Sequence, residues 1–182
     1  MLEPEVRNLA FIPRWTTVHK VQGQDDAQHS HVVAVYADQL AEYFKWNGDR
    51  AALIRYALWH DIGELASGDM PGPFKRRVVD EQKYTELVNG WLAGIFIGGE
   101  WKKPDDPTLL SIVKLADCID EVLWVHYKSG PPQVVHDATV RMHAALAALP
   151  FSEEMKHHIL LQMDVSISNI WNPPPNYVED LK

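Results

Sequence analysis

Acidic and imidazole side chains interrupt the apolar pattern at three separate places along the chain. His60, Asp61 and Glu64 fall within two helical turns of a largely apolar segment. Asp117 interrupts a second apolar stretch, and His29 stands inside a third. A carboxylate in a core stripe is costly unless it is paired or binds a metal. Two imidazoles with two carboxylates suit a divalent cation such as Mn, Fe, Co, Zn or Mg.

A His-Asp dipeptide alone is weak evidence for a metal site. The chain contains a second pair, His136-Asp137, which follows Pro131-Pro132 at an expected helix start, where the aspartate can serve the helix N-terminus. We interpret that pair as structural. For His60-Asp61, a structural pairing inside the core is the alternative to a metal site.

Helices must bring these distant residues together, and the apolar residues recur with helical period along the whole chain. We therefore predict an all-α fold of six or seven helices, in one domain that covers residues 1–182. The expected helices run over about 26–46, 50–67, 80–97, 107–128, 133–149 and 152–169. Asp25 or Asp26, Asp49 and Asp106 are the expected N-caps of the first, second and fourth helices.

The second expected helix contains the densest group of polar residues. Its spacing puts Asp61 on one buried face with Leu58 and Leu65. His60 and Glu64 fall on the neighbouring row of the same helix, one turn apart. The acidic side chain of Glu64 could thus reach a metal-bound water without being a ligand.

Composition and charge narrow the function classes. The 182 residues are 46% hydrophobic and 23% charged, as in an ordinary globular protein, and carry a net charge of −8. This acidity argues against nucleic-acid polymers and anionic membranes as partners. Cys118 is the only cysteine, which excludes a disulfide framework and a cysteine zinc cage. With no signal-peptide pattern and no long apolar run, we expect a cytoplasmic protein without a membrane span.

Five short blocks, in order, resemble a known family. They are Arg14-Trp15, Gln28-His29-Ser30, His60-Asp61-Ile62-Gly63-Glu64, Gly68-Asp69-Met70-Pro71-Gly72-Pro73-Phe74-Lys75 and Val113-Lys114-Leu115-Ala116-Asp117. This order is similar to the HD-domain phosphohydrolase superfamily, in particular to the bacterial 5′-deoxynucleotidases and the viral dATP triphosphohydrolases. Combined motifs are far more specific than the dipeptide alone.

The resemblance implies a metal-dependent hydrolase that cleaves the 5′ phosphate ester of 2′-deoxynucleotides. By analogy, four residues would hold the divalent metal: His29, His60, Asp61 and Asp117. Glu64 would orient or activate the water, and Asp69 would lie beside the reacting phosphate. The substrate would be bound by Arg14 and Trp15 on the sugar side and by Lys75 and Lys114 on the phosphate side. Members of the family commonly form homo-oligomers, which we expect here as well.

Two departures from the family pattern bear on the substrate. Gly72 stands where the deoxynucleotidases usually carry threonine, and Thr16 and Thr17 are more polar than usual. The preferred base and the number of phosphates are therefore left open. The enzyme would release either orthophosphate from a deoxynucleoside monophosphate or triphosphate from a triphosphate, notably dATP. The alternative from another class is a catalytically silent helical module that binds a nucleotide or a partner protein.

Overall fold

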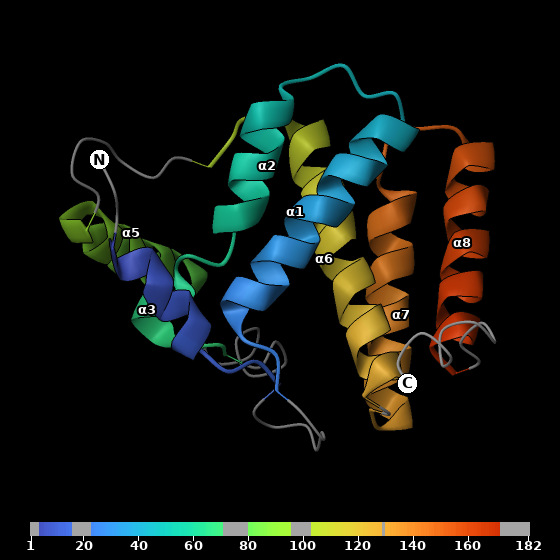
Figure 1. Ribbon diagram of the computed structural model, residues 1–182. Coiled ribbons are helices and arrows are strands. Elements are labelled where there is room, and N and C mark those ends of the chain that lie inside the picture. Colours follow the sequence, from blue (N-terminus) through green and yellow to red (C-terminus); the bar gives the residue numbers. More distant parts are fainter. Residues whose placement is uncertain (1–3, 16–22, 71–79, 96–102, 129, 172–182) are drawn as a thin grey trace, which may run out of the picture.

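The structure, a computed structural model, describes residues 4–15, 23–70, 80–95, 103–128 and 130–171. Its helices are η1 (Pro4–Phe11, a 3-10 helix), α1 (Asp26–Tyr43), α2 (Arg50–Trp59), α3 (Glu64–Ser67), α5 (Glu81–Ile95), α6 (Pro107–Tyr127), α7 (Pro132–Ala147) and α8 (Glu153–Trp171) (Figure 1). Within the described ranges, the sole β-type pairing is one antiparallel bridge between Pro13 and Asp25. The all-α fold class is confirmed.

Aspartate side chains define where three of the helices begin. Asp25 caps α1 in a reciprocal capping box, in which its carboxylate accepts a hydrogen bond from the backbone N–H of Gln28. Asp49 caps α2, and Asp106 caps α6 ahead of Pro107 at the first helical position. Asp26 is therefore not the cap, and its fully buried carboxyl group is available for another role.

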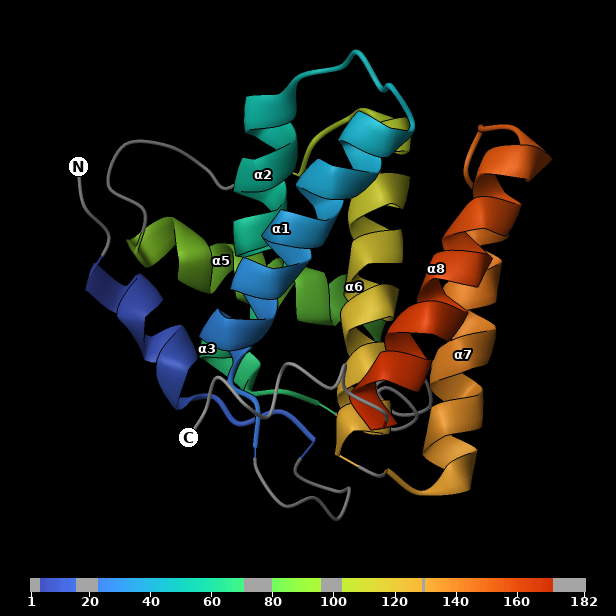
Figure 2. The same ribbon diagram turned by 45° about the vertical axis from the view of Figure 1, so that its right-hand side comes forward.

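Helix α6 is the centre of the packing. Helix α1 lies against both α2 and α6, and α7 and α8 cover the other side of α6 (Figures 1 and 2). The fully buried core residues include Val33, Ala37, Leu53, Ala57, Ile112, Leu115 and Val122. Because α1, α2 and α6 are mutually packed, polar groups on their facing sides are held at short distances inside the protein.

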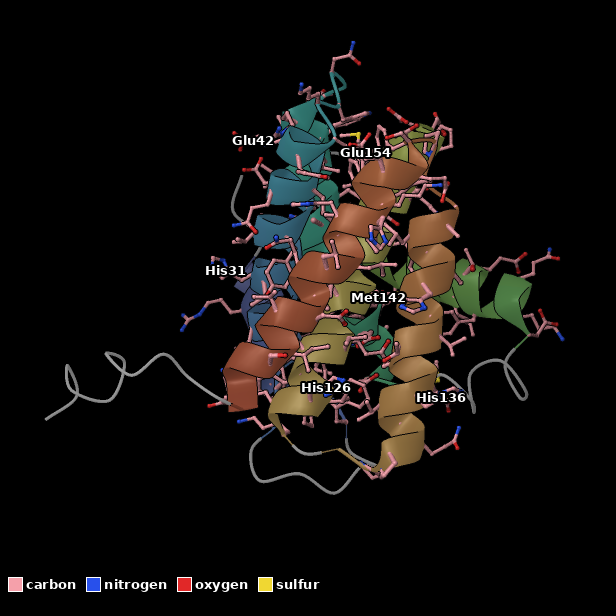
Figure 3. All side chains as sticks on the ribbon, turned by 90° about the vertical axis from the view of Figure 1, so that its right-hand side faces the viewer. His31, Glu42, His126, His136, Met142 and Glu154 are labelled. Carbon is pink, nitrogen blue, oxygen red and sulfur yellow. The ribbon has the colours of Figure 1, made fainter. Side chains whose placement is uncertain are left out.

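The remaining elements lie around this group. Figure 3 looks onto α7 and α8, beyond which α5 extends sideways. Leu9 of η1 forms a second small core with Ile62, and η1 also contacts α1 and α3. None of the described helices is both long enough and apolar enough to cross a membrane.

The second helix is shorter than the sequence predicts. Helix α2 ends at Trp59, and tight three-residue turns carry the chain from there into α3. A ring nitrogen of His60, Nδ1, lies 2.8 Å from the Ala57 carbonyl oxygen, which in a continued α-helix would accept the N–H of residue 61. The expected shared face is consequently wrong: Leu58 is 40% exposed, and Leu65 packs on the small core around Leu9.

Candidate metal centre

Three helices deliver the central side chains of the site. His29 projects from the first turns of α1 and is fully buried, whereas His31, two positions further, is exposed and lies at the outer edge of α1 in Figure 3. His60 and Asp61 follow directly after α2, and Asp117 comes from the middle of α6. Although α2 ends at Trp59, before His60 and Asp61, the packing of α1, α2 and α6 still brings the side chains of the site together.

The ligand atoms of His29, His60 and Asp117 form a compact group. One nitrogen or oxygen from each residue lies within 4.8 Å of the other two. Nε2 of His29 is 3.3 Å from Oδ1 of Asp117. Oδ2 of Asp61 is 3.6 Å from Nε2 of His29 and 3.3 Å from Nε2 of His60. The four predicted ligands therefore converge from three separate segments of the chain.

The Nε2 ring nitrogens of His29 and His60, unpaired among the described residues, are direct evidence that the two imidazoles suit a metal ion. Nε2 of His29 and Nε2 of His60 are both buried and form no hydrogen bond with another described residue. Buried polar atoms are nearly always satisfied, so two adjacent orphan nitrogens require a further partner. With a carboxylate on each side, these nitrogens form the nitrogen-and-oxygen donor set that a borderline divalent cation prefers.

The charge state of the carboxylates also suits a cation. Burial opposes ionisation of Asp61 and Asp117, but neighbouring cationic groups outweigh it and lower both pKa values. For Asp61 these groups include Arg14, whose Nη1 donates to Oδ2 at 2.9 Å. For Asp117 they include Lys114, whose Nζ donates to Oδ2 at 2.6 Å. Both carboxylates are therefore ionised at neutral pH.

Asp120 lies behind His29, on the side away from the ligand group. Its Oδ2 accepts a hydrogen bond from Nδ1–H of His29, with 2.6 Å between the two atoms, and another from Nε2 of Gln24 at 2.8 Å. Asp120 and Gln24 are 5% and 3% exposed. The sequence shows Asp120 only as an acidic neighbour of Asp117, and nothing in the sequence points to Gln24.

Asp26 and Glu64 form a carboxyl pair beside this site. Both carboxylate oxygens of Asp26 and Oε2 of Glu64 are buried and form no hydrogen bond with another described residue. Burial, together with the charges of Asp61 and Asp26, raises the pKa of Glu64 to about 10. Nη1 of Arg14 lies 3.6 Å from Oδ1 of Asp26. At neutral pH the pair thus holds a proton next to the ligand group.

Arg14 and Trp15 reach the same region from the N-terminal segment. The Arg14 backbone N–H donates to the carbonyl of Gln24 at 2.8 Å, which ties this segment to the start of α1. The Trp15 backbone N–H donates to Oδ2 of Asp69 at 3.2 Å. Asp69, predicted to lie beside a phosphate, therefore also supports the residue predicted to face the sugar.

The two predicted lysines differ in what the structure describes. Lys114 is more than half exposed, and its ammonium group is engaged by Asp117. Lys75 lies outside the described residues, as do Gly72, Thr16 and Thr17. The residues that sequence reasoning missed are Gln24, Asp26 and Asp120, which lie behind the predicted ligands or beside the predicted base.

A family model described as 5′-deoxynucleotidase YfbR-like matches residues 4–90. The chain is 34% identical to a 5′-deoxynucleotidase of Enterobacter sp. (strain 638), over 44% of each chain. That match spans less than half the length of this relative. This chain is also 27% identical to a dATP triphosphohydrolase of Salmonella phage PMBT28, over 80% of this chain and 78% of the phage protein.

Solved structures share the fold over nearly the whole chain. The cyanophage S-2L HD phosphohydrolase DatZ, solved with dA and one catalytic Zn²⁺ ion, superposes with a TM-score of 0.71 at 20% identity. The superposition covers 93% of this chain and 98% of that one. A conserved hypothetical protein from Pyrococcus furiosus superposes with a TM-score of 0.58 at 19% identity, over 88% and 95%. In its sequence, its fold and its convergent His and Asp residues, the chain is similar to 5′-deoxynucleotidases, a phage dATP triphosphohydrolase and an HD phosphohydrolase.

Proposed function

We propose that this protein is a metal-dependent phosphohydrolase that cleaves the 5′ phosphate ester of 2′-deoxynucleotides. The observation that carries the proposal is the convergence of His29, His60 and Asp117 ligand atoms within 4.8 Å of one another. The similarity to 5′-deoxynucleotidases and to a phage dATP triphosphohydrolase supports the substrate class.

His29, His60, Asp61 and Asp117 are the proposed metal ligands. A divalent ion bound by them would polarise a phosphoryl oxygen and lower the pKa of a bound water. Phosphate esters resist hydrolysis because their own negative charge repels nucleophiles, so a concentrated positive charge at this point is what the reaction needs. Zinc is a suitable first candidate for the donor set, and manganese, cobalt, iron and magnesium are to be compared with it.

Glu64 is the proposed general acid or base. Its carboxyl group lies in a buried setting shared with Asp26 and Arg14, and its pKa is raised to about 10 before any cation enters. A carboxyl group that holds a proton at neutral pH can pass it to the departing 5′ oxygen, and its ionised form can accept a proton from the attacking water. Because Glu64 is not a proposed ligand, it is free for this exchange.

Arg14, Trp15 and Asp69 are the proposed contacts around the sugar and the reacting phosphate. The guanidinium group of Arg14 lies among acidic groups of the site, where it can pair with a substrate oxygen. The indole of Trp15 is a rigid, bulky group suited to exclude a ribose 2′-hydroxyl. Lys114 and Lys75 are the proposed phosphate-side cations.

The number of phosphates is to be decided from the inorganic product. Purified protein is incubated with each deoxynucleoside mono- and triphosphate in the presence of zinc, cobalt, manganese or magnesium. Release of orthophosphate from a monophosphate would identify a 5′-deoxynucleotidase, and release of intact triphosphate, from dATP in particular, a triphosphohydrolase. Protein that binds metal but turns over no nucleotide would instead support a catalytically silent module.

We further propose that residues 1–182 act as one domain, in the cytoplasm and as a homo-oligomer, on a small deoxynucleotide rather than a nucleic-acid polymer. The net charge of −8 supports a small substrate held by local cations. The single cysteine, Cys118, is buried and suits a reducing compartment. Light scattering after size-exclusion chromatography would give the oligomeric state.

A further inference from the structure

Two buried residues have no place in the proposed reaction: Asp120, which contacts Nδ1 of His29, and Gln24, which contacts Asp120. Asp120 comes from α6, one turn after Asp117, and Gln24 precedes the cap of α1. Each is at least 95% buried, so both are costly to place in the core without a partner. Asp120 accepts a hydrogen bond from His29 and another from the side-chain amide of Gln24.

The direction of these hydrogen bonds determines the state of the His29 ring. The Asp120 carboxylate can only accept, so Nδ1 of His29 must carry the proton that it shares at 2.6 Å. In the neutral imidazole the lone pair is then on Nε2, the atom that lies 3.3 Å from Asp117 and that no other residue in the described segments hydrogen-bonds. The opposite tautomer would leave Nε2 protonated and unable to bind a cation.

Gln24 in turn holds Asp120. Its side-chain amide donates to the same Oδ2 that accepts from His29, so the carboxylate oxygen is fixed by two donors. The backbone carbonyl of Gln24 accepts the N–H of Arg14. One residue thereby links the rear of the ligand group to the segment that carries Arg14 and Trp15.

We infer that Asp120, supported by Gln24, is a positioning residue of the metal centre, and that it holds the ring of His29 so that Nε2 faces Asp117 and His60. This inference rests on the proposed metal site. Partners of this kind fix the tautomer and orientation of a ligating imidazole, and their loss commonly weakens metal affinity by about 10- to 100-fold.

The test measures zinc affinity of the metal-stripped, full-length protein by competition with a chelator of known affinity. Asp120→Asn keeps the shape of the side chain but removes its charge, and we expect a zinc dissociation constant about 10- to 100-fold higher than in the wild type. Gln24→Met removes the amide donor at similar side-chain length. For Gln24→Met we expect a smaller increase in the zinc dissociation constant than for Asp120→Asn. This second variant still tests the inference if Asp120→Asn is too unstable to purify.

Asp38→Asn is the matched control. Asp38 is an α1 carboxylate that pairs with Arg50 of α2, away from His29, so its loss should reduce stability without changing zinc affinity. Wild-type zinc affinity in both Asp120→Asn and Gln24→Met would overturn the inference and leave the proposed function intact. If the wild-type protein itself binds no zinc, cobalt or manganese, the proposed function fails, and this inference fails with it.

Discussion

The carboxylate of Asp69 accepts a hydrogen bond from the backbone N–H of Trp15, although 54 positions separate them in the chain. Trp15 has φ of 63°, in the left-handed region that residues with bulky side chains seldom adopt. The contact therefore holds a strained residue and sets the direction in which its indole leaves the backbone. It connects the chain after α3 with the N-terminal segment at the edge of the metal centre.

Replacing the indole should alter sugar selectivity. We expect Trp15→Ala to raise activity on ribonucleotides relative to deoxynucleotides, because the bulk proposed to exclude a 2′-hydroxyl is removed. The measurement is the ratio of kcat/KM for a deoxynucleotide and its ribonucleotide. Trp124→Ala serves as the control for losing a large indole elsewhere, and an unchanged ratio in Trp15→Ala would show that Trp15 does not sense C2′.

Two substitutions at Asp69 separate its contact with Trp15 from a role at the phosphate. Asp69→Asn retains an oxygen that can accept the Trp15 N–H, whereas Asp69→Ala does not. If Asp69 also acts at the phosphate, as we expect, kcat falls in both variants but sugar selectivity falls only in Asp69→Ala. Wild-type kcat in Asp69→Asn would limit Asp69 to supporting Trp15.

Removing a proposed ligand should remove the metal. We expect Asp117→Ala to lose most of its bound metal, since a carboxylate oxygen of the ligand group is deleted and Lys114 is left without its partner. Elemental analysis of the purified protein checks this. Asp164→Ala, an exposed aspartate of α8, should keep the wild-type metal content. Equal metal content in both variants would exclude Asp117 from the ligand set.

Glu64 should affect rate and not metal content. Glu64→Gln keeps the size and polarity of the side chain but cannot exchange a proton, so we expect kcat to fall by about 10²-fold or more. Bound metal, measured on the same sample, should stay at the wild-type level. Glu154→Gln, on the exposed start of α8 (Figure 3), is the control. Loss of metal in Glu64→Gln would instead identify Glu64 as a ligand.

The metal-free protein should lose stability as the pH rises from 6.5 to 9. Burial opposes protonation of His29, but the carboxylates of Asp117 and Asp120 outweigh it and raise its pKa from 6.5 to about 9. The raised pKa of His29 stabilises the fold fully below pH 6.5. This contribution to the free energy of unfolding is lost as the pH rises towards 9. Glu64, with its pKa raised to about 10, acts in the same direction.

Urea unfolding in the presence of a chelator, at pH 6.5 and pH 9, measures this change. The lowered pKa values of Asp61 and Asp117 affect stability only at acidic pH, outside the interval. Between pH 6.5 and pH 9, His29→Gln should lose less unfolding free energy than the wild type. His157→Gln, an exposed control on α8, should lose as much as the wild type. A free energy of unfolding that is constant or rises with pH in the wild type would contradict the raised pKa of His29.

The amino-acid sequence by itself determined the helical fold class, most helix starts and the residue types of the metal centre. Asp49 and Asp106 act as caps where predicted, because capping is a local interaction between a side chain and nearby backbone N–H groups. The apolar period likewise shows which helices have a face to bury. The proposed ligands stood out because a carboxylate in such a face is costly without a partner.

Only the tertiary structure decided where α2 ends and what lies behind the proposed ligands. His60 shortens the helix through a contact with its own backbone, which helical periodicity does not register. The hydrogen bond of Gln24 with Asp120 and the electrostatic influence of Asp26 on Glu64 involve residues distant in sequence, so no spacing rule predicts them. They depend on the packing of α1 against α2 and α6, and burial of each charged group then determines which atoms keep their protons.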